Sequence, residues 1–328
     1  MHKINPVAAG SRPANSRLRA TFLAGAALLA SVAGLAGVAQ AKPLTSIGVT
    51  MGSLGNPYFV ALVKGCTAQA RANGTHVAVT SVSADYDLNK QFTQIDNFIA
   101  AGVNLIVLNA VDPNAILPAI KRAQAAGIAV VAADVAANGA DATVMTDNTA
   151  AGNMSCAYLA KKIGNKGEVI IENGPQVSSV IDRVNGCKAA LAKSPDIKIL
   201  SSDQDGKGSR DGGLAVMQGY LIRYPDVNGV FTINDPQAIG SELAAKQQHR
   251  TGIVITSVDG APDIVAALKT NGLIQASASQ DPYTMGRNAV KMGEQILDGH
   301  PPADKVMLMA PKLITTDNVD SYVGWTQH

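Results

Sequence analysis

The chain has 328 residues, of which 47% are hydrophobic and 16% charged, a composition typical of a folded protein of about two domains and not of a disordered chain. Lys and Arg number 27 and Asp and Glu number 25, and four of the basic residues lie among the first 41 positions, which leaves a net charge of −2 on the remainder. A nearly neutral body gives no electrostatic reason to expect a nucleic acid or an anionic membrane as partner.

The first 41 residues have the pattern of a secretory signal peptide. A basic, polar stretch (residues 1–20) precedes an uncharged segment rich in Ala, Leu, Gly and Val, which ends at the small-x-small triplet Ala39-Gln40-Ala41. We expect cleavage before Lys42 and export to a bacterial periplasm, which gives a mature chain of 287 residues. A membrane anchor is the alternative that the length of the apolar segment leaves open.

Apolar strands alternate with helices from residue 46 onward. The first half predicts strands at residues 46–50, 76–82, 105–108 and 128–133, with helices at residues 57–71, 89–101 and 112–127. The same alternation restarts at residues 169–171 and continues to residues 253–258. Continuous apolar strands that alternate with helices indicate a parallel sheet covered on both faces, so we expect two α/β domains.

The two halves repeat one motif. Residues 105–116 (LIVLNAVDPNAI) and 230–239 (VFTINDPQAI) each give an apolar strand, an Asn and an Asp-Pro pair. In each half the next strand ends in Asp, 25 residues after the Asn, which pairs Asn109 with Asp134 and Asn234 with Asp259. Ligands of open parallel sheets bind at the carboxyl ends of the strands, and these side chains suit hydroxyl groups. We therefore predict a cleft for a neutral polyhydroxylated ligand; simple capping of turns and helices is the alternative.

These segments resemble the ribose-binding protein family, the periplasmic sugar-binding proteins of ABC importers. The resemblance covers residues 44–310 and includes GSLGNPYF (residues 52–59), TDN (residues 146–148), SVDGAPD (residues 257–263) and Gln280. It implies two doubly wound, Rossmann-like parallel-sheet lobes joined by a three-crossover hinge that closes around a sugar. The implied lobes are residues 42–146 plus 281–308 and residues 147–280 plus 309–328.

The resemblance also implies the ligand contacts. Asn56 is expected to bond a hydroxyl group, and Tyr58 and Phe59 to pack on the apolar face of the sugar, although both rings could instead belong to the core. The remaining implied contacts are Asn109, Asp134, Asn234, Asp259 and Gln280, whereas Asn148 is expected to serve as hinge and cap.

Four positions depart from the family pattern. Val135 and Ile181 stand where the family has Arg, and Gly208 and Val258 stand where it has an aromatic residue. We therefore expect a less basic and roomier pocket, which another pentose, a hexose or a sugar alcohol fits as well as ribose. The candidates for the missing polar contacts are Gln176, Ser178, Ser179, Asp182, Lys207 and Arg183, and we include Arg183 in the predicted site.

The predicted function is a monomeric periplasmic receptor that delivers a sugar or polyol to an ABC permease, without catalysis, cofactor or metal. A chemotaxis or signalling receptor of the same fold is the alternative. A regulator of the lactose-repressor class would need a helix-turn-helix where this chain has an apolar export signal. An enzyme has little support, because no GxSxG elbow, P-loop or GxGxxG follows a strand.

The three cysteines predict one disulfide and one free thiol. Cys156 and Cys187 lie in consecutive predicted helices of the second lobe (residues 149–162 and 179–192), which can pack side by side. Export supplies an oxidising compartment, so we predict a bond between them. Cys66 lies in the first lobe and is expected to be a buried thiol; three unpaired cysteines are the alternative.

Overall fold

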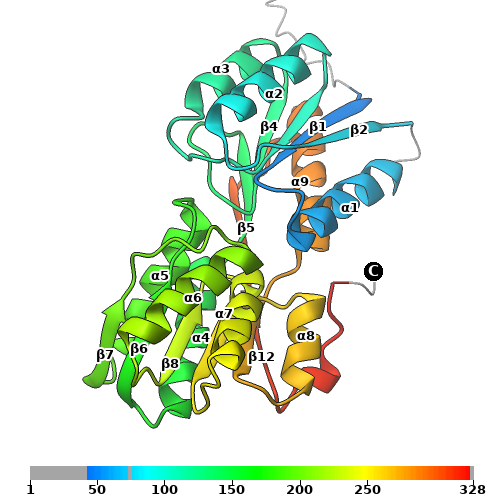
Figure 1. The fold of residues 1–328 in the computed structure, drawn as a ribbon. Helices are drawn as coiled ribbons and strands as arrows, with labels where there is room; N and C mark the ends of the chain where they lie inside the picture. Colours follow the sequence, from blue (N-terminus) through cyan, green and yellow to red (C-terminus); the bar gives the residue numbers. More distant parts are fainter. Residues whose placement is uncertain (1–42, 73–75, 326–328) are drawn as a thin grey trace, which may run out of the picture. The chain divides into compact units, whose positions relative to one another are not determined.

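A computed structural model describes residues 43–72 and 76–325, so the predicted signal peptide lies outside the described residues. Within the described part, the chain forms two α/β lobes, each built on one six-stranded sheet (Figure 1). The strand orders are β11-β5-β4-β3-β1-β2 and β12-β10-β9-β8-β6-β7. When the strands of each sheet are counted in chain order, both sheets have the same order. This confirms the predicted pair of doubly wound lobes.

The first sheet is parallel throughout. Its strands are β1 (Ser46–Met51), β2 (Ala78–Ser83), β3 (Leu105–Leu108), β4 (Ala129–Ala133), β5 (Ala142–Thr146) and β11 (Val306–Met309). Its helices are α1 (Pro57–Ala72), α2 (Leu88–Ala100), α3 (Leu117–Ala125) and α9 (Pro282–Leu297).

The second sheet is parallel except for β12, which runs antiparallel to β10. Its strands are β6 (Lys166–Glu172), β7 (Asp196–Ser201), β8 (Gly229–Thr232), β9 (Val254–Asp259), β10 (Ile274–Ser279) and β12 (Lys312–Thr315). Its helices are α4 (Asn148–Lys162), α5 (Ser178–Leu191), α6 (Arg210–Arg223), α7 (Asp235–Gln247), α8 (Pro262–Lys269) and the 3₁₀ turn η1 (Val319–Ser321).

The core of each lobe lies on both faces of its sheet, because successive side chains of a strand point to opposite faces. In β3, Leu105 and Val107 belong to the same apolar cluster as α1 and α9. Ile106 and Leu108 belong instead to the cluster that contains α2 and α3. All four side chains are fully buried, which explains the uninterrupted apolar run in the sequence.

Three crossovers join the lobes, as the resemblance implied. The chain leaves the first sheet after β5, returns after β10 into α9 and β11, and leaves again between β11 and β12. We keep the predicted ranges as working definitions of the first and second lobes. β11 ends at Met309, one residue beyond the predicted boundary.

The two Asp-Pro pairs start different structures, so the helix predicted at residues 112–127 is wrong at its start. Asp112 does not begin a helix: its Oδ1 accepts hydrogen bonds from the backbone N–H groups of Asn114 and Ala115, and α3 begins only at Leu117. In the second half Asn234 directly precedes Asp235 and caps α7. Two additional residues separate Asn109 from Asp112, so Asn109 cannot cap a helix in the same way.

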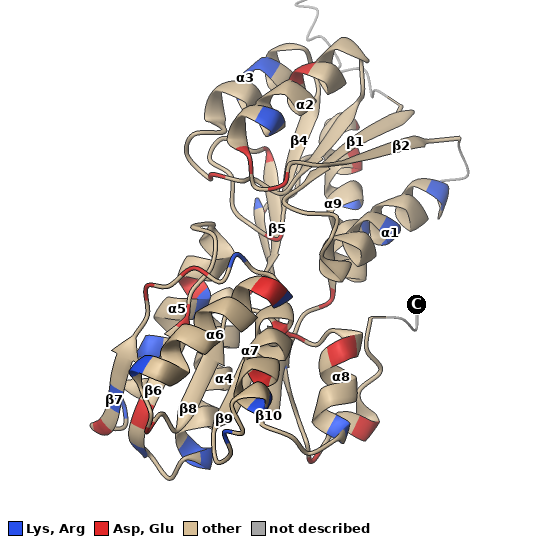
Figure 2. Ribbon diagram, viewed as in Figure 1, with Lys and Arg blue, Asp and Glu red and all other residues tan. Residues whose placement is uncertain are grey.

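Charged residues of both signs lie along the helices of both lobes (Figure 2). Among the described residues, no three His, Cys, Asp or Glu side chains lie close enough together to hold a metal ion. In the same part of the chain, no helix combines the length and the apolar composition needed to span a bilayer.

A disulfide joins α4 to α5. Cys156 and Cys187 are bonded, with their Cα atoms 5.0 Å apart. Two glycines allow the helices to approach this closely: a Cβ at Gly152 would lie 2.0 Å from a carbonyl oxygen of α5, and one at Gly186 would lie 2.1 Å from a carbonyl oxygen of α4. Cys66 is a free, buried thiol, and burial raises its pKa to about 12.

The disulfide should stabilise the second lobe without shaping the site. It spans 31 residues, and the chain-entropy relation gives about 4 kcal/mol for a loop of this size. The double variant Cys156→Ala/Cys187→Ala should lose this amount in urea unfolding, and wild-type protein treated with reductant should behave in the same way. Identical unfolding curves with and without reductant would contradict the assignment.

Candidate ligand-binding site

One cavity collects polar side chains from the strand ends of both lobes. Asn109 and Asp134 follow β3 and β4 of the first lobe, and Asn234 and Asp259 lie at the ends of β8 and β9 of the second. Every predicted site residue except Gln280 lines this cavity, namely Asn56, Tyr58, Phe59, Asn109, Asp134, Arg183, Asn234 and Asp259. The tertiary structure therefore brings together residues that are up to about 200 positions apart in the sequence.

Asp134 is a buried carboxylate with unused hydrogen-bonding capacity. Its backbone is left-handed (φ 71°), and its side chain is 5% exposed. Oδ2 accepts a hydrogen bond from Asn109 Nδ2 at 3.0 Å, whereas Oδ1 is buried and has no hydrogen-bond partner among the described residues. Burial raises the pKa of Asp134, and the positive charge of Arg183 partly offsets this. An acceptor of this kind suits a ligand hydroxyl group.

Asp259 is the corresponding carboxylate of the second lobe. It is 3% exposed, and its Oδ1 lies 3.3 Å from Arg183 Nη1 and accepts a hydrogen bond from Gln280 Nε2 at 2.7 Å. Burial raises its pKa to about 6, although Arg183 counteracts the shift. Asp259 is therefore closer to titration at neutral pH than an exposed carboxylate.

Arg183 is fixed by several partners in the second lobe. Its Nε donates to Asn148 Oδ1 at 2.8 Å, and its Nη1 donates to the carbonyl oxygen of Ile233 at 2.8 Å. The side chain is 5% exposed. Asn148 thus joins the hinge to Arg183, while the neighbouring Asp147 caps α4. Arg183 supplies a buried positive charge near both carboxylates, which would otherwise repel each other.

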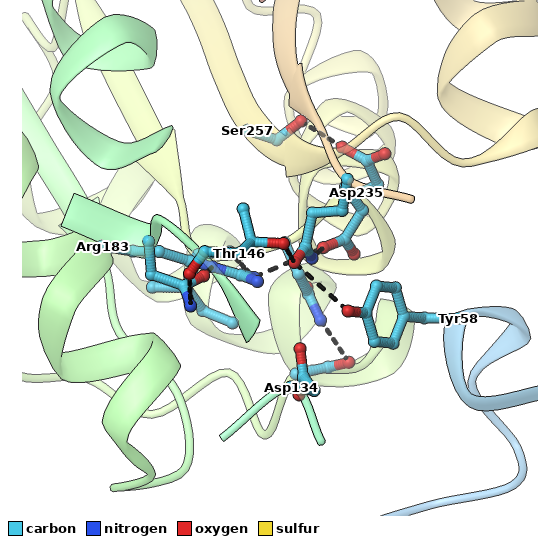
Figure 3. Close-up of polar contacts among 12 residues, drawn as sticks. Tyr58, Asp134, Thr146, Arg183, Asp235 and Ser257 are labelled. Atoms are coloured by element: carbon cyan, nitrogen blue, oxygen red, sulfur yellow. Dashed lines mark hydrogen bonds and ion pairs between the residues drawn. The ribbon is translucent and has the colours of Figure 1, made fainter. Parts of the chain in front are cut away.

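Gln280 lies behind Asp259 rather than in the cavity lining. Its Oε1 accepts hydrogen bonds from Thr146 Oγ1 at 2.7 Å and Tyr58 Oη at 3.3 Å, while its Nε2 donates to Asp259 (Figure 3). The side chain therefore links the first helix, the first crossover and the second-lobe carboxylate. In this structure it orients Asp259. The direct ligand contact of Gln280 stays a prediction.

The aromatic pair of the first loop serves both the cavity and the core. Tyr58 and Phe59 line the cavity, are at most 4% exposed and meet edge to face, with ring centroids 5.4 Å apart. Both also belong to the apolar cluster of α1 and α9. Asn56 Oδ1 accepts a hydrogen bond from the backbone N–H of Tyr58 at 2.9 Å, so this Asn fixes the turn that presents the rings.

Tyr86 is a cavity residue that the sequence reasoning missed. It follows β2 in a left-handed conformation (φ 55°) and lies across from Gly208, where a Cβ would be 3.9 Å from the Tyr86 hydroxyl oxygen. Burial, with a smaller effect of the nearby carboxylates, raises its pKa above the usual value. The signal available was a Tyr three residues after a strand in a chain with only 4% aromatic residues.

The departures from the family pattern fall into two groups. Val135 and Gly208 line the cavity, so their small side chains leave space there. Ile181 is 41% exposed and Val258 is fully buried in the core, and neither lines the cavity. Among the other candidates for polar contacts, Ser179 lines the cavity. Ser178 Oγ accepts a hydrogen bond from the backbone N–H of Ala136 at 2.7 Å.

The cavity combines two carboxylates, one guanidinium group, amide side chains and aromatic rings, for a net charge of −1. This set provides acceptors and donors for hydroxyl groups and apolar faces for C–H groups, whereas an anionic ligand would meet net repulsion.

Comparison with known proteins assigns the family. Residues 47–301 match the model of the periplasmic binding protein domain. The chain is 33% identical over 258 residues to the ribose import binding protein of Bacillus subtilis, covering 77% of this chain and 82% of that protein. It is 30% identical over 310 residues to the xylitol-binding protein of Mycolicibacterium smegmatis, covering 93% of this chain and 87% of that protein.

Solved structures of ABC transporter solute binding proteins have the same fold as this chain. An ABC transporter solute binding protein from Mycobacterium smegmatis with bound glycerol superposes with a TM-score of 0.80 at 29% identity, covering 86% of this chain and 98% of that one. A periplasmic solute binding protein from Actinobacillus succinogenes with bound D-allose gives a TM-score of 0.78 at 26% identity, covering 85% of this chain and 100% of that one. The chain therefore belongs to the periplasmic binding protein domain family.

Proposed function

We propose that this protein captures a sugar or sugar alcohol between its lobes and delivers it to the permease of an ABC importer. The observation that carries the proposal is the pair of buried carboxylates, Asp134 from the first lobe and Asp259 from the second, in one cavity. A ligand with several hydroxyl groups can donate to both carboxylates and so bridge the lobes. The relatives named for ribose import and xylitol binding support the same ligand class.

Binding requires the lobes to open and close. The cavity is small, about 40 Å³, and its lining residues Tyr58, Asp134 and Asp259 are at most 5% exposed. We therefore expect a monosaccharide to enter only when the lobes separate. We propose that the three crossovers act as a hinge and that closure buries the ligand.

The remaining features complete the proposal. The N-terminal 41 residues act as a cleaved signal peptide that directs the protein to the periplasm, where it works as a monomer. The ligand leaves chemically unchanged, because the carboxylates serve as hydrogen-bond acceptors and no cofactor or metal takes part. The small side chains at Val135 and Gly208 leave room for another pentose, a hexose or a sugar alcohol as well as for ribose.

A ligand panel tests the function. We expect ribose, allose, xylitol, glucitol, myo-inositol or glycerol to raise the melting temperature, because a ligand that binds only the folded state stabilises it by mass action. The best ligand should also reduce the radius of gyration in solution scattering and should be recovered intact by NMR. A panel without any stabilising compound, or a ligand converted to product, would refute the proposal.

The variant Asp134→Asn separates binding from stability. It removes the charge from a buried acceptor, so the binding free energy measured by calorimetry should become less favourable by about 2–4 kcal/mol. The free energy of unfolding should not fall, because a neutral amide is easier to bury and Asn tolerates the left-handed backbone. As a control, Asp96→Asn changes an exposed carboxylate paired with Arg122 and should alter neither quantity. Unchanged affinity in Asp134→Asn would count against the site.

Affinity should rise with pH through the pKa of Asp259, which is about 6 in the ligand-free protein. A hydroxyl group that donates to this carboxylate favours its ionised form, so binding below this pH releases a proton, and affinity changes at most about tenfold per pH unit. Asp259→Asn should bind more weakly and with a smaller pH dependence.

Stability of the ligand-free protein should change in the opposite direction. A carboxyl pKa raised above 3.8 means that the folded state holds the proton more tightly than the unfolded chain. The stability of wild type relative to Asp259→Asn should therefore be greatest at low pH and decline as pH rises through about 6. Calorimetry and urea unfolding between pH 4 and 8 check both trends; parallel trends would show that Asp259 is not the titrating acceptor.

A further inference from the structure

Trp325 makes a paired contact with the backbone of the site. It follows η1 near the end of the described chain and is 7% exposed. Its indole N–H donates to two carbonyl oxygens at once, that of Asp259 at 3.1 Å and that of Gln280 at 3.0 Å. These are the two residues whose side chains hydrogen-bond to each other beside the cavity. The indole thus adds a second link between the ends of β9 and β10, which the backbone hydrogen bond from Gln280 N–H to the carbonyl oxygen of Asp259 at 2.8 Å already joins.

The backbone that Trp325 holds is strained. Asp259 has a φ of 137°, a backbone angle that residues other than Gly rarely adopt. The next residue, Gly260, has a φ of 75°. Such a strained backbone conformation persists only when several interactions with the surrounding structure hold it in place. Here the C-terminal segment contributes a second bond, because Tyr322 Oη donates to the carbonyl oxygen of Gly260 at 3.2 Å. The backbone N–H of Ala261 is held separately, by a carboxylate oxygen of Asp235 at 2.7 Å.

The ring of Trp325 also contacts the first lobe. It packs edge to face on Tyr58, with ring centroids 5.6 Å apart and an angle of 75° between the planes. Tyr58 lines the cavity, and its hydroxyl group donates to Gln280 Oε1. Trp325 therefore contacts three residues of the site: the ring of Tyr58 and the backbone carbonyl groups of Asp259 and Gln280. It does not itself line the cavity.

We propose that Trp325 is a positioning residue of the ligand site: its indole fixes the backbone of Asp259 and Gln280 and supports the ring of Tyr58, so that the carboxylate is held ready for a ligand hydroxyl. The proposal rests on the proposed sugar-binding function of this cavity. It assigns to the C-terminal segment of the chain a role in affinity as well as in folding.

The wild-type protein offers a direct spectroscopic test, because Trp325 is the only tryptophan in the sequence. Its buried ring should emit at short wavelength and resist quenching by acrylamide. Titration with the best compound of the ligand panel should shift the emission along the same saturation curve as calorimetry, since the proposed closure moves Tyr58 of the first lobe relative to Trp325, whose indole is bonded to the backbone of Asp259 and Gln280. An emission that stays constant while calorimetry records binding would overturn the proposal.

The variant Trp325→Phe tests the indole N–H separately from the ring. It keeps an aromatic ring near Tyr58 but leaves the two carbonyl groups without their shared donor, so we expect affinity to fall roughly tenfold. The matched control is Asp320→Ala, which removes an exposed ion pair with Lys269 in the same segment and should leave affinity unchanged. Wild-type affinity in Trp325→Phe would refute the positioning role.

Hydrogen exchange keeps this test independent of the ligand. In ligand-free Trp325→Phe, exchange should accelerate in peptides that cover residues 257–262 and 279–281, while β6 (Lys166–Glu172) remains protected as in wild type. Uniform acceleration would indicate a merely structural role, and unchanged exchange at the strand ends would also overturn the proposal. If no compound binds wild-type protein, the proposed function fails, yet the exchange comparison still decides whether Trp325 holds this backbone.

Discussion

The site depends on the burial of two carboxylates close to one guanidinium group. Asp134 and Asp259 are almost completely removed from water, and burial raises the pKa of both. Arg183 stabilises their charged forms, and its position is fixed in turn by Asn148 of the hinge and by the carbonyl oxygen of Ile233. Because the protein leaves part of this hydrogen-bonding capacity unused, most clearly at Asp134 Oδ1, a polyhydroxylated ligand can complete it.

The repeated architecture explains how each lobe contributes one such carboxylate. Both sheets share one strand order, so the ends of β3 and β4 correspond to the ends of β8 and β9. The equivalent residues nevertheless differ in their local contacts. Asn234 caps α7 and donates to the carbonyl oxygen of Gly208, whereas Asn109 accepts from the backbone N–H of Gly52 and donates to Asp134. The fold is duplicated, but the two hydrogen-bond networks are not.

The connections between the lobes are as important as the lobes themselves. Gln280 in the second crossover joins Tyr58, Thr146 and Asp259, and Trp325 beneath it contacts both Tyr58 and the backbone of Asp259. These contacts couple the hinge to the site, because movement of a crossover would displace the same side chains that face the ligand. We therefore expect ligand specificity to depend on residues outside the cavity lining as well as on those within it.

The sequence by itself determined the alternation of strands and helices, the two lobes, and the strand-end residues Asn109, Asp134, Asn234 and Asp259, because periodicity and a repeated spacing are local properties. It also placed Cys156 and Cys187 on neighbouring helices. It did not reveal that α3 starts at Leu117, that Tyr86 lines the cavity, that Gln280 lies behind Asp259, or that Trp325 holds both. Those outcomes were decided by tertiary structure, since each depends on contacts between segments far apart in the chain, which no local pattern records.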